Sequence, residues 1–205
     1  VRGLIVEEPL LGAVDFEGEV ERRRAAKLTY ERSIAVSKEL FNGTRMGRGA
    51  NVKEIKQAVQ GIVDQVLSNE TSLGGLSALK DYDDYSFTHS VNVCIFCVAI
   101  GRRLGLTKPQ LYDLGLAALV HDIGLLDFPE VNIGPTGGPV THVETGAARL
   151  EKMPLWAELA PLVRAHHERM DGSGPLGLSG SAVPLPARNL ALAEDSAPAN
   201  NPHAP

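Results

Sequence analysis

A chain of 205 residues, 43% of them hydrophobic, can form one domain, or one domain with an extension. Its net charge of −5 argues against the binding of nucleic-acid polymers, because gripping a phosphate backbone needs a basic surface. A small phosphate ligand is still compatible, since a metal ion can supply positive charge locally. No stretch reaches the roughly 18 apolar residues of a membrane span. No secretory signal is present either, so we expect a cytoplasmic protein with no membrane partner.

The N-terminal part is expected to hold a linker followed by a charged helix. Residues 1–18 contain glycine and proline with little periodicity, which indicates a linker or the edge of an upstream module, such as a regulatory domain. Residues 19–41 lack both proline and glycine, and their apolar residues can share one helical face. Three glycines within residues 42–50 predict a loop that ends this helix.

The clearest amphipathic pattern follows this loop. Asn51 and Glu54 are spaced like a helix N-cap and its N3 partner. Apolar residues then recur at helical spacing across residues 52–67, which predicts a helix with one buried face. Regularly spaced leucines over residues 73–79 predict a short helical continuation.

Two further segments are expected to form the centre of a bundle. Residues 89–104 are apolar nearly all round, which is typical of a buried helix. Cys94 and Cys97 lie within them, and their spacing allows a redox or zinc pair. Because no second cysteine pair completes a zinc site, buried free thiols are the stronger interpretation. Residues 109–122 predict another apolar helix, which Gly124 can stop.

The C-terminal part continues the helical pattern. A capping-box pattern opens a predicted helix over residues 141–150. Residues 155–169 predict another helix, with a break or restart at Pro161. Strand-like alternation is nearly absent, so the predicted fold class is all-α. Residues 195–205 have no apolar pattern and are expected to be a disordered tail.

Histidines and carboxylates give the chain its chemistry. Five of the six histidines lie between residues 89 and 167. Singly, each has a structural explanation, such as a core histidine or a histidine at a helix C-terminus, where the dipole favours it. Together, each near a predicted helix end, they form a pattern that is difficult to attribute to chance. Imidazole and carboxylate groups suit iron, manganese or zinc, and one carboxylate can bridge two ions. The candidate residues are His89, His121, Asp122, His142, His166 and His167.

Five segments, in this order, resemble the HD-GYP branch of the HD superfamily of metal-dependent phosphohydrolases. They are Asp84–Val93, Leu114–Gly124, His142–Gly146, His166–Pro175 and Pro184–Glu194. Of these, His142–Gly146 resembles the third sequence motif of the family. His166–Pro175 resembles the signature motif after which the branch is named. The resemblance implies an HD-superfamily helical bundle over residues 19–194.

The resemblance also implies a centre of two divalent ions, iron or manganese. It assigns one ion to His89, His121 and Asp122 with a late carboxylate, and the other to His142, His166 and His167. Asp122 would bridge the ions and act in catalysis with the water that they activate. The late carboxylate is Glu194, where the family has aspartate, and the adjacent Asp195 could serve instead if the helix shifts by one residue.

Several positions depart from the family pattern. The lysine that follows the His-Asp-x-Gly motif is Leu125 here, and the signature tyrosine is missing because Gly174 is followed directly by Pro175. The connection over residues 125–140 is shorter than usual. Tyr85 stands where some members have a glutamate that supports a third ion, so we expect two ions at most. The residues that bind substrate therefore stay unknown.

Three functions follow from these observations. The first is a phosphodiesterase that hydrolyses the cyclic dinucleotide cyclic di-GMP through a water activated by two metal ions. The second is a catalytically weak or inactive HD-GYP-like domain that senses or scaffolds, which the departures favour. The third is another HD-family phosphohydrolase that acts on nucleotides, which the double histidine and the turn after it argue against.

Overall fold

The structure is a computed structural model, and it describes residues 16–48, 50–68, 85–128, 141–154 and 156–197. Within these ranges the fold consists of helices, with one isolated bridge between Asp171 and Ser179. The predicted all-α class is confirmed. No helix in the described part is long and apolar enough to cross a membrane.

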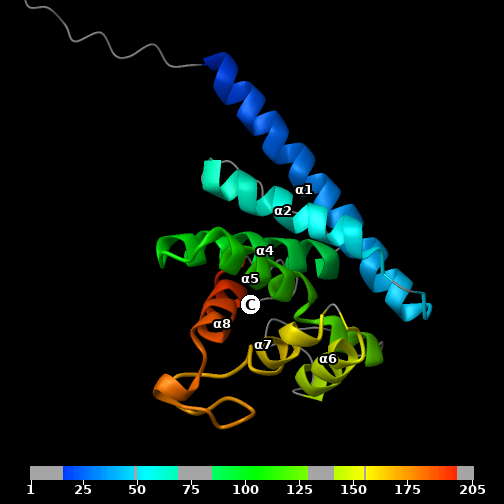
Figure 1. The fold of residues 1–205 in the computed structure, drawn as a ribbon, viewed down its shortest axis with the longest axis vertical. Helices are drawn as coiled ribbons and strands as arrows, with labels where there is room; N and C mark the ends of the chain where they lie inside the picture. The colour runs from blue at the N-terminus through cyan, green and yellow to red at the C-terminus, as the bar shows by residue number, and fades with distance from the viewer. Residues whose placement is uncertain (1–15, 49, 69–84, 129–140, 155, 198–205) are drawn as a thin grey trace, which may run out of the picture.

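The N-terminal half stacks four long helices (Figure 1). They are α1 (Phe16–Arg45), α2 (Val52–Ser68), α4 (Tyr85–Arg103) and α5 (Lys108–Val120). Helix α1 packs on α2 and α4, while α2 packs on α4 and α5, so the four share one apolar core. In Figure 1 the N-terminal end of α1 projects beyond the other helices.

Helix α1 is longer than the sequence predicts. It begins inside the segment interpreted as a linker, and it runs through Gly43 into the residues expected to form a loop. The Thr44 hydroxyl donates a hydrogen bond of 2.7 Å to the Leu40 carbonyl, which keeps this last turn closed. Residues 1–15 lie outside the described ranges, as do the helical continuation at 73–79 and most of the predicted tail.

Helix α2 and helix α4 have the predicted character. The Glu54 amide donates to the Asn51 side chain at 3.4 Å, as an N-cap requires. The stripe of α2 is buried, and its members are Ile55, Ala58, Val59, Ile62, Val63 and Val66. Helix α4 buries Cys94 and Cys97 as free thiols, in line with the apolar interpretation.

The second half consists of shorter elements, most of which lie on the side of α4 and α5 away from α1 (Figure 1), while η1 also contacts α1. They are η1 (Ile123–Asp127), α6 (Thr141–Glu151), η2 (Ala157–Leu159), α7 (Ala160–Arg164), η3 (Gly180–Ala182) and α8 (Leu185–Ser196). Helix α6 packs on η1 and α7, and α8 packs on α4.

Two helix ends differ from the prediction. Helix α5 ends at Val120, so Asp122 lies in the junction with η1 rather than on the helix. Helix α7 ends at Arg164, although the sequence predicts helix to residue 169. The Val163 carbonyl there accepts from the ring of His166, and the Ala165 carbonyl accepts from the Glu168 amide. These bonds replace the i→i−4 pattern that a continuing helix would need.

Candidate metal centre

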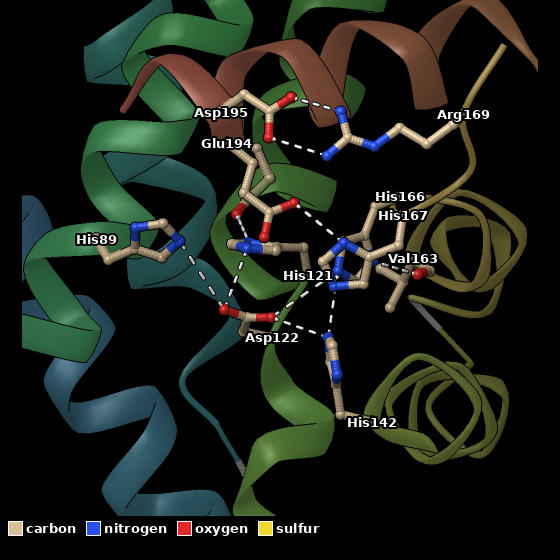
Figure 2. A network of polar contacts seen from close by, with 11 residues as sticks. His89, His121, Asp122, His142, Val163, His166, His167, Arg169, Glu194 and Asp195 are labelled. Carbon is tan, nitrogen blue, oxygen red and sulfur yellow. Dashed lines mark hydrogen bonds and ion pairs between the residues drawn. The ribbon is translucent and has the colours of Figure 1, made fainter. Parts of the chain in front are cut away.

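All seven predicted metal residues meet at one place, between the two halves of the fold (Figure 2). Helix α4 supplies His89, helix α6 supplies His142, and helix α8 supplies Glu194. The α5–η1 junction supplies His121 and Asp122, and the turn after α7 supplies His166 and His167. Residues up to 105 positions apart in the sequence (89 to 194) therefore converge.

The Asp122 carboxylate is at the centre of the group, and its two oxygens face different histidines (Figure 2). Oδ2 lies 3.2 Å from Nε2 of His121 and 4.0 Å from Nε2 of His89. Oδ1 lies 3.2 Å from Nε2 of His142 and 3.9 Å from Nε2 of His166. A carboxylate placed in this way can contact two cations at once.

Backbone carbonyls orient two of the histidine rings. Nδ1 of His121 lies 2.8 Å from the Ala118 oxygen, and Nδ1 of His166 lies 2.5 Å from the Val163 oxygen. Because a carbonyl only accepts, Nδ1 must carry the proton in each ring. Nε2 of each ring then faces Asp122, at 3.2 Å for His121 and 3.9 Å for His166, and this is the nitrogen that would contact a metal ion.

Glu194 completes the group from α8. Its Oε2 lies 3.5 Å from Nδ1 of His167, and one of its oxygens lies within 4.8 Å of ligand atoms of both His121 and His166. Asp195, the alternative carboxylate, is half exposed and instead pairs with Arg169. The geometry therefore favours Glu194 over Asp195 as the late carboxylate.

A close contact between η1 and α6 brings His142 to Asp122. A Cβ added at Gly124 would lie 2.0 Å from the His142 carbonyl oxygen and 2.6 Å from the Gly146 amide nitrogen. These are backbone atoms that cannot move aside separately, so only glycine allows this approach. The sequence pattern assigned Gly124 only the role of ending a helix and gave Gly146 no role.

Glu168 has a structural role that the sequence pattern did not reveal. Its buried carboxylate accepts hydrogen bonds from the Leu176 amide at 2.6 Å and the Leu178 amide at 2.7 Å. A Cβ at Gly174 would lie 2.6 Å from the Glu168 Cα, so this glycine is needed for the loop to fold back. The only sequence signal for this role is the position of Glu168 directly after the two histidines.

Burial and mutual charge set the protonation of the group. Burial lowers the pKa of His89 to about 4 and that of His167 to about 4. For Asp122, burial opposes ionisation, but the adjacent His121 charge outweighs it and holds its pKa well below the usual range. Burial also opposes the charging of His121, yet Asp122 raises the pKa of that ring to about 9. Burial raises the pKa of Glu194 to about 7.

These residues fit divalent ions. Three sets of ligand atoms lie within 4.8 Å of one another: His89, His121 and Asp122; His142, His166 and His167; and His121, His166 and Glu194. The first two sets match the two predicted half-sites. In addition, Nε2 of His121 is fully buried and has no hydrogen bond of good geometry in the described part of the chain. A cation bound by this nitrogen and by the Asp122 oxygen 3.2 Å away would give it a partner of good geometry.

The positions that depart from the family pattern are only partly described. Leu125 lies in η1, and its side chain is buried, with 9% of its surface exposed. Gly174 and Pro175 lie in the loop that Glu168 holds. The Tyr85 side chain and residues 129–140 are outside the described part.

Comparisons with known proteins agree with this geometry. A family model described as HD domain matches residues 76–197. Cyclic di-GMP phosphodiesterase PA4108 of Pseudomonas aeruginosa is 32% identical over 185 residues, which cover 85% of this chain and 44% of that protein. The 3'3'-cGAMP-specific phosphodiesterase 1 of Vibrio cholerae is 34% identical over 141 residues, which cover 64% of this chain and 32% of that protein. This chain therefore spans less than half the length of these relatives.

A solved structure shares the fold. Bd1817, a HDG"Y"P protein from Bdellovibrio bacteriovorus, superposes with a TM-score of 0.72 over 88% of this chain and 61% of that chain. The two sequences are 22% identical. At this level of identity the likeness shows the arrangement of helices alone.

Proposed function

This chain belongs to the HD domain family, a family of divalent-metal phosphohydrolases, and its motifs and relatives support its HD-GYP branch; from that premise we propose that it hydrolyses a cyclic dinucleotide. The proposed substrate is cyclic di-GMP. The proposed cofactors are two divalent ions, iron or manganese, since imidazole and carboxylate ligands suit both.

The split contacts of Asp122 are the observation that supports this proposal most. Each of its oxygens faces a different set of histidines, at distances that leave room for a cation on either side. A structural aspartate in a polar core would need no second set of imidazoles. We propose His89, His121 and Glu194 for the first ion, His142, His166 and His167 for the second, and Asp122 as the bridge.

The remaining chemistry is divided between the ions and the chain. When bound, two divalent ions would supply charge for the phosphate oxygens and activate the attacking water. The chain orients the centre through the carbonyls that fix His121 and His166, and it holds the η1–α6 contact through Gly124. The negative net charge of the chain is compatible with an anionic substrate, because the ions provide the local positive field.

The substrate class follows from the relatives, whose printed names are divided between cyclic di-GMP and 3'3'-cGAMP. One further relative, of Xanthomonas campestris, is named a cyclic di-GMP phosphodiesterase response regulator. By analogy we propose a regulatory partner domain for this chain and a site of action in the cytoplasm.

A specific observation favours a weak enzyme as the second candidate. Leu125 offers no hydrogen-bond donor where family members have lysine, and its side chain is buried. Phosphate binding would then rely on the ions alone. Such a domain would bind metal and ligand but turn over slowly, as a sensor or scaffold would.

The test is to measure bound iron, manganese and zinc on protein purified without oxygen, and then to analyse products. Cyclic di-GMP, 3'3'-cGAMP and unrelated nucleotides are each offered to the metal-loaded protein. Hydrolysis of cyclic di-GMP supports the proposal, and binding without turnover supports the second candidate. Hydrolysis of other nucleotides alone would assign a different phosphohydrolase, and protein that binds no divalent metal would contradict all three.

A further inference from the structure

The turn that holds His166 and His167 is not part of a helix. Helix α7 ends at Arg164, two residues before the first of these histidines. The rings are therefore not positioned by a continuing helix. Their placement relative to α8, which supplies Glu194, depends on contacts between the turn and that helix, which include a small apolar cluster of Ala165, Val183 and Ala187 as well as polar contacts.

Arg169 and His167 reach α8 from this turn (Figure 2). Nη1 of Arg169 lies 2.7 Å from Oδ2 of Asp195, and Nη2 lies 3.2 Å from Oδ1, so the guanidinium and the carboxylate form a two-bond fork. Nδ1 of His167 lies 3.5 Å from Oε2 of Glu194, the residue directly before Asp195. Both contacts therefore connect the turn at residues 166–169 to residues 194 and 195 of α8.

The geometry of a helix connects these two contacts. Consecutive residues of a helix point about 100° apart, because a turn takes 3.6 residues. The rotation of α8 that directs Asp195 at Arg169 is therefore the one that directs Glu194 at the histidines. Bidentate pairs between arginine and carboxylate also fix the relative orientation of their partners, which a single contact does not.

We propose that the Arg169–Asp195 pair is a positioning device for the metal centre. It holds the turn at His166 and His167 against α8. It also sets the rotation of α8 about its axis, at which Glu194 faces His121, His166 and His167. The pair itself touches neither ion nor substrate. This inference rests on the proposed function only in requiring that the centre binds divalent ions.

A purely electrostatic effect would give a different result from positioning. Removing the negative charge of Asp195 would weaken the binding of a cation nearby, and removing the positive charge of Arg169 would strengthen it. Loss of positioning weakens binding in both cases. The sign of the Arg169 effect therefore separates the two explanations.

The experiment is titration of the metal-free full chain with Mn²⁺ by calorimetry. We expect Arg169→Gln and Asp195→Asn each to lower the affinity for one of the two Mn²⁺ ions by about 10-fold. Changes to residues that support metal ligands typically have an effect of this size. The double variant should be no weaker than the weaker single variant, because the two residues act as a pair. Asp195→Glu, which can still pair with arginine, should keep part of the affinity. The matched control is Arg23→Gln, which removes an exposed pair with Glu19 on α1 and should change nothing.

Unchanged Mn²⁺ affinity in both variants would overturn the inference, as would stronger binding by Arg169→Gln. Melting temperatures and circular dichroism of the variants should match those of the wild type, since the pair is half exposed and such pairs add little stability. A loss of Mn²⁺ binding accompanied by an equal loss of folded protein would also count against a positioning role. Wild-type protein that binds no Mn²⁺ would contradict the proposed function instead.

Discussion

The two halves of this molecule are held together in different ways. Helices α1, α2, α4 and α5 pack through apolar faces in one core, which also holds the buried Tyr30–Asn92 hydrogen bond of 2.9 Å and a hydrogen bond from Arg102 to the Val66 carbonyl. The part from His121 onward adds side chains such as Leu150, Val163 and Leu190 to the same core. Its short elements are also held by individual polar and backbone contacts, such as the close approach at Gly124 and the hydrogen bonds to Glu168. Changes in the apolar core should therefore affect mainly stability, while changes at the individual contacts of the second half should also affect the geometry of the site.

The largest effect expected in the second half is that of Asp122→Ala. Because this carboxylate faces both sets of histidines, its loss should abolish the binding of both ions, whereas His142→Ala should impair one. Metal analysis after dialysis against Mn²⁺ gives the number of ions per chain. Retention of both ions by Asp122→Ala, with a more severe loss in His142→Ala, would show that Asp122 does not bridge.

Gly124→Ala should damage both stability and metal binding. The added methyl group would lie 2.0 Å from the His142 carbonyl oxygen, so η1 and α6 must separate. We expect a loss of about 3 kcal/mol in the free energy of unfolding, at the upper end of overpacking effects, and weaker metal binding at His142. Gly43→Ala is the matched control, since the nearest atom to its added Cβ lies 4.0 Å away and the site is helical. Equal effects of the two changes in denaturant unfolding would refute this account.

Ile62→Ala should separate stability from site geometry. This side chain is fully buried on α2, in the apolar core. Its truncation should cost about 2–5 kcal/mol of unfolding free energy, from lost burial and the cavity left behind. The folded protein should still bind metal with wild-type stoichiometry. The variant could instead lose its metal at denaturant concentrations where circular dichroism still shows native protein. The stability of the core and the geometry of the site would then not be separable in this way.

The smallest effect is expected for the thiols of the apolar half. Burial raises the pKa of Cys94 to about 12, so at pH 9 only about one thiol in a thousand is ionised. The thiolate is the reactive form, and its fraction rises only as the pH approaches that pKa. Iodoacetamide should therefore label neither cysteine of the native protein, and both once it is unfolded. Rapid labelling of native protein at pH 8 would show that α4 opens readily.

The sequence allowed the two halves to be predicted to different extents. Periodicity was sufficient for α2 and α4, because one apolar face is buried along the whole length of α2 and α4 is buried nearly all round. It failed at the end of α7, where the ring of His166 takes a carbonyl that a helix would use. A local side-chain bond of that kind leaves no trace in hydrophobic spacing.

The site residues were accessible from the sequence for another reason. Histidines are few in this chain, six in 205 residues, and their order along it, together with the carboxylates near them, resembles a known family. The residues that support them were not accessible in the same way. Gly146 and Glu168 act through close backbone approach and through amides many positions away, and these features exist only once the chain is folded.

The irregular turn at His166 and His167 also has a consequence for local motion. Segments without continuous helix open at a lower free energy than the core, and their amides exchange with solvent sooner. Ions bound to both histidines would close this weak segment by mass action, since they bind only the ordered form. The turn, more than the helical core, is where the supply of divalent metal would alter the susceptibility of the chain to proteolysis.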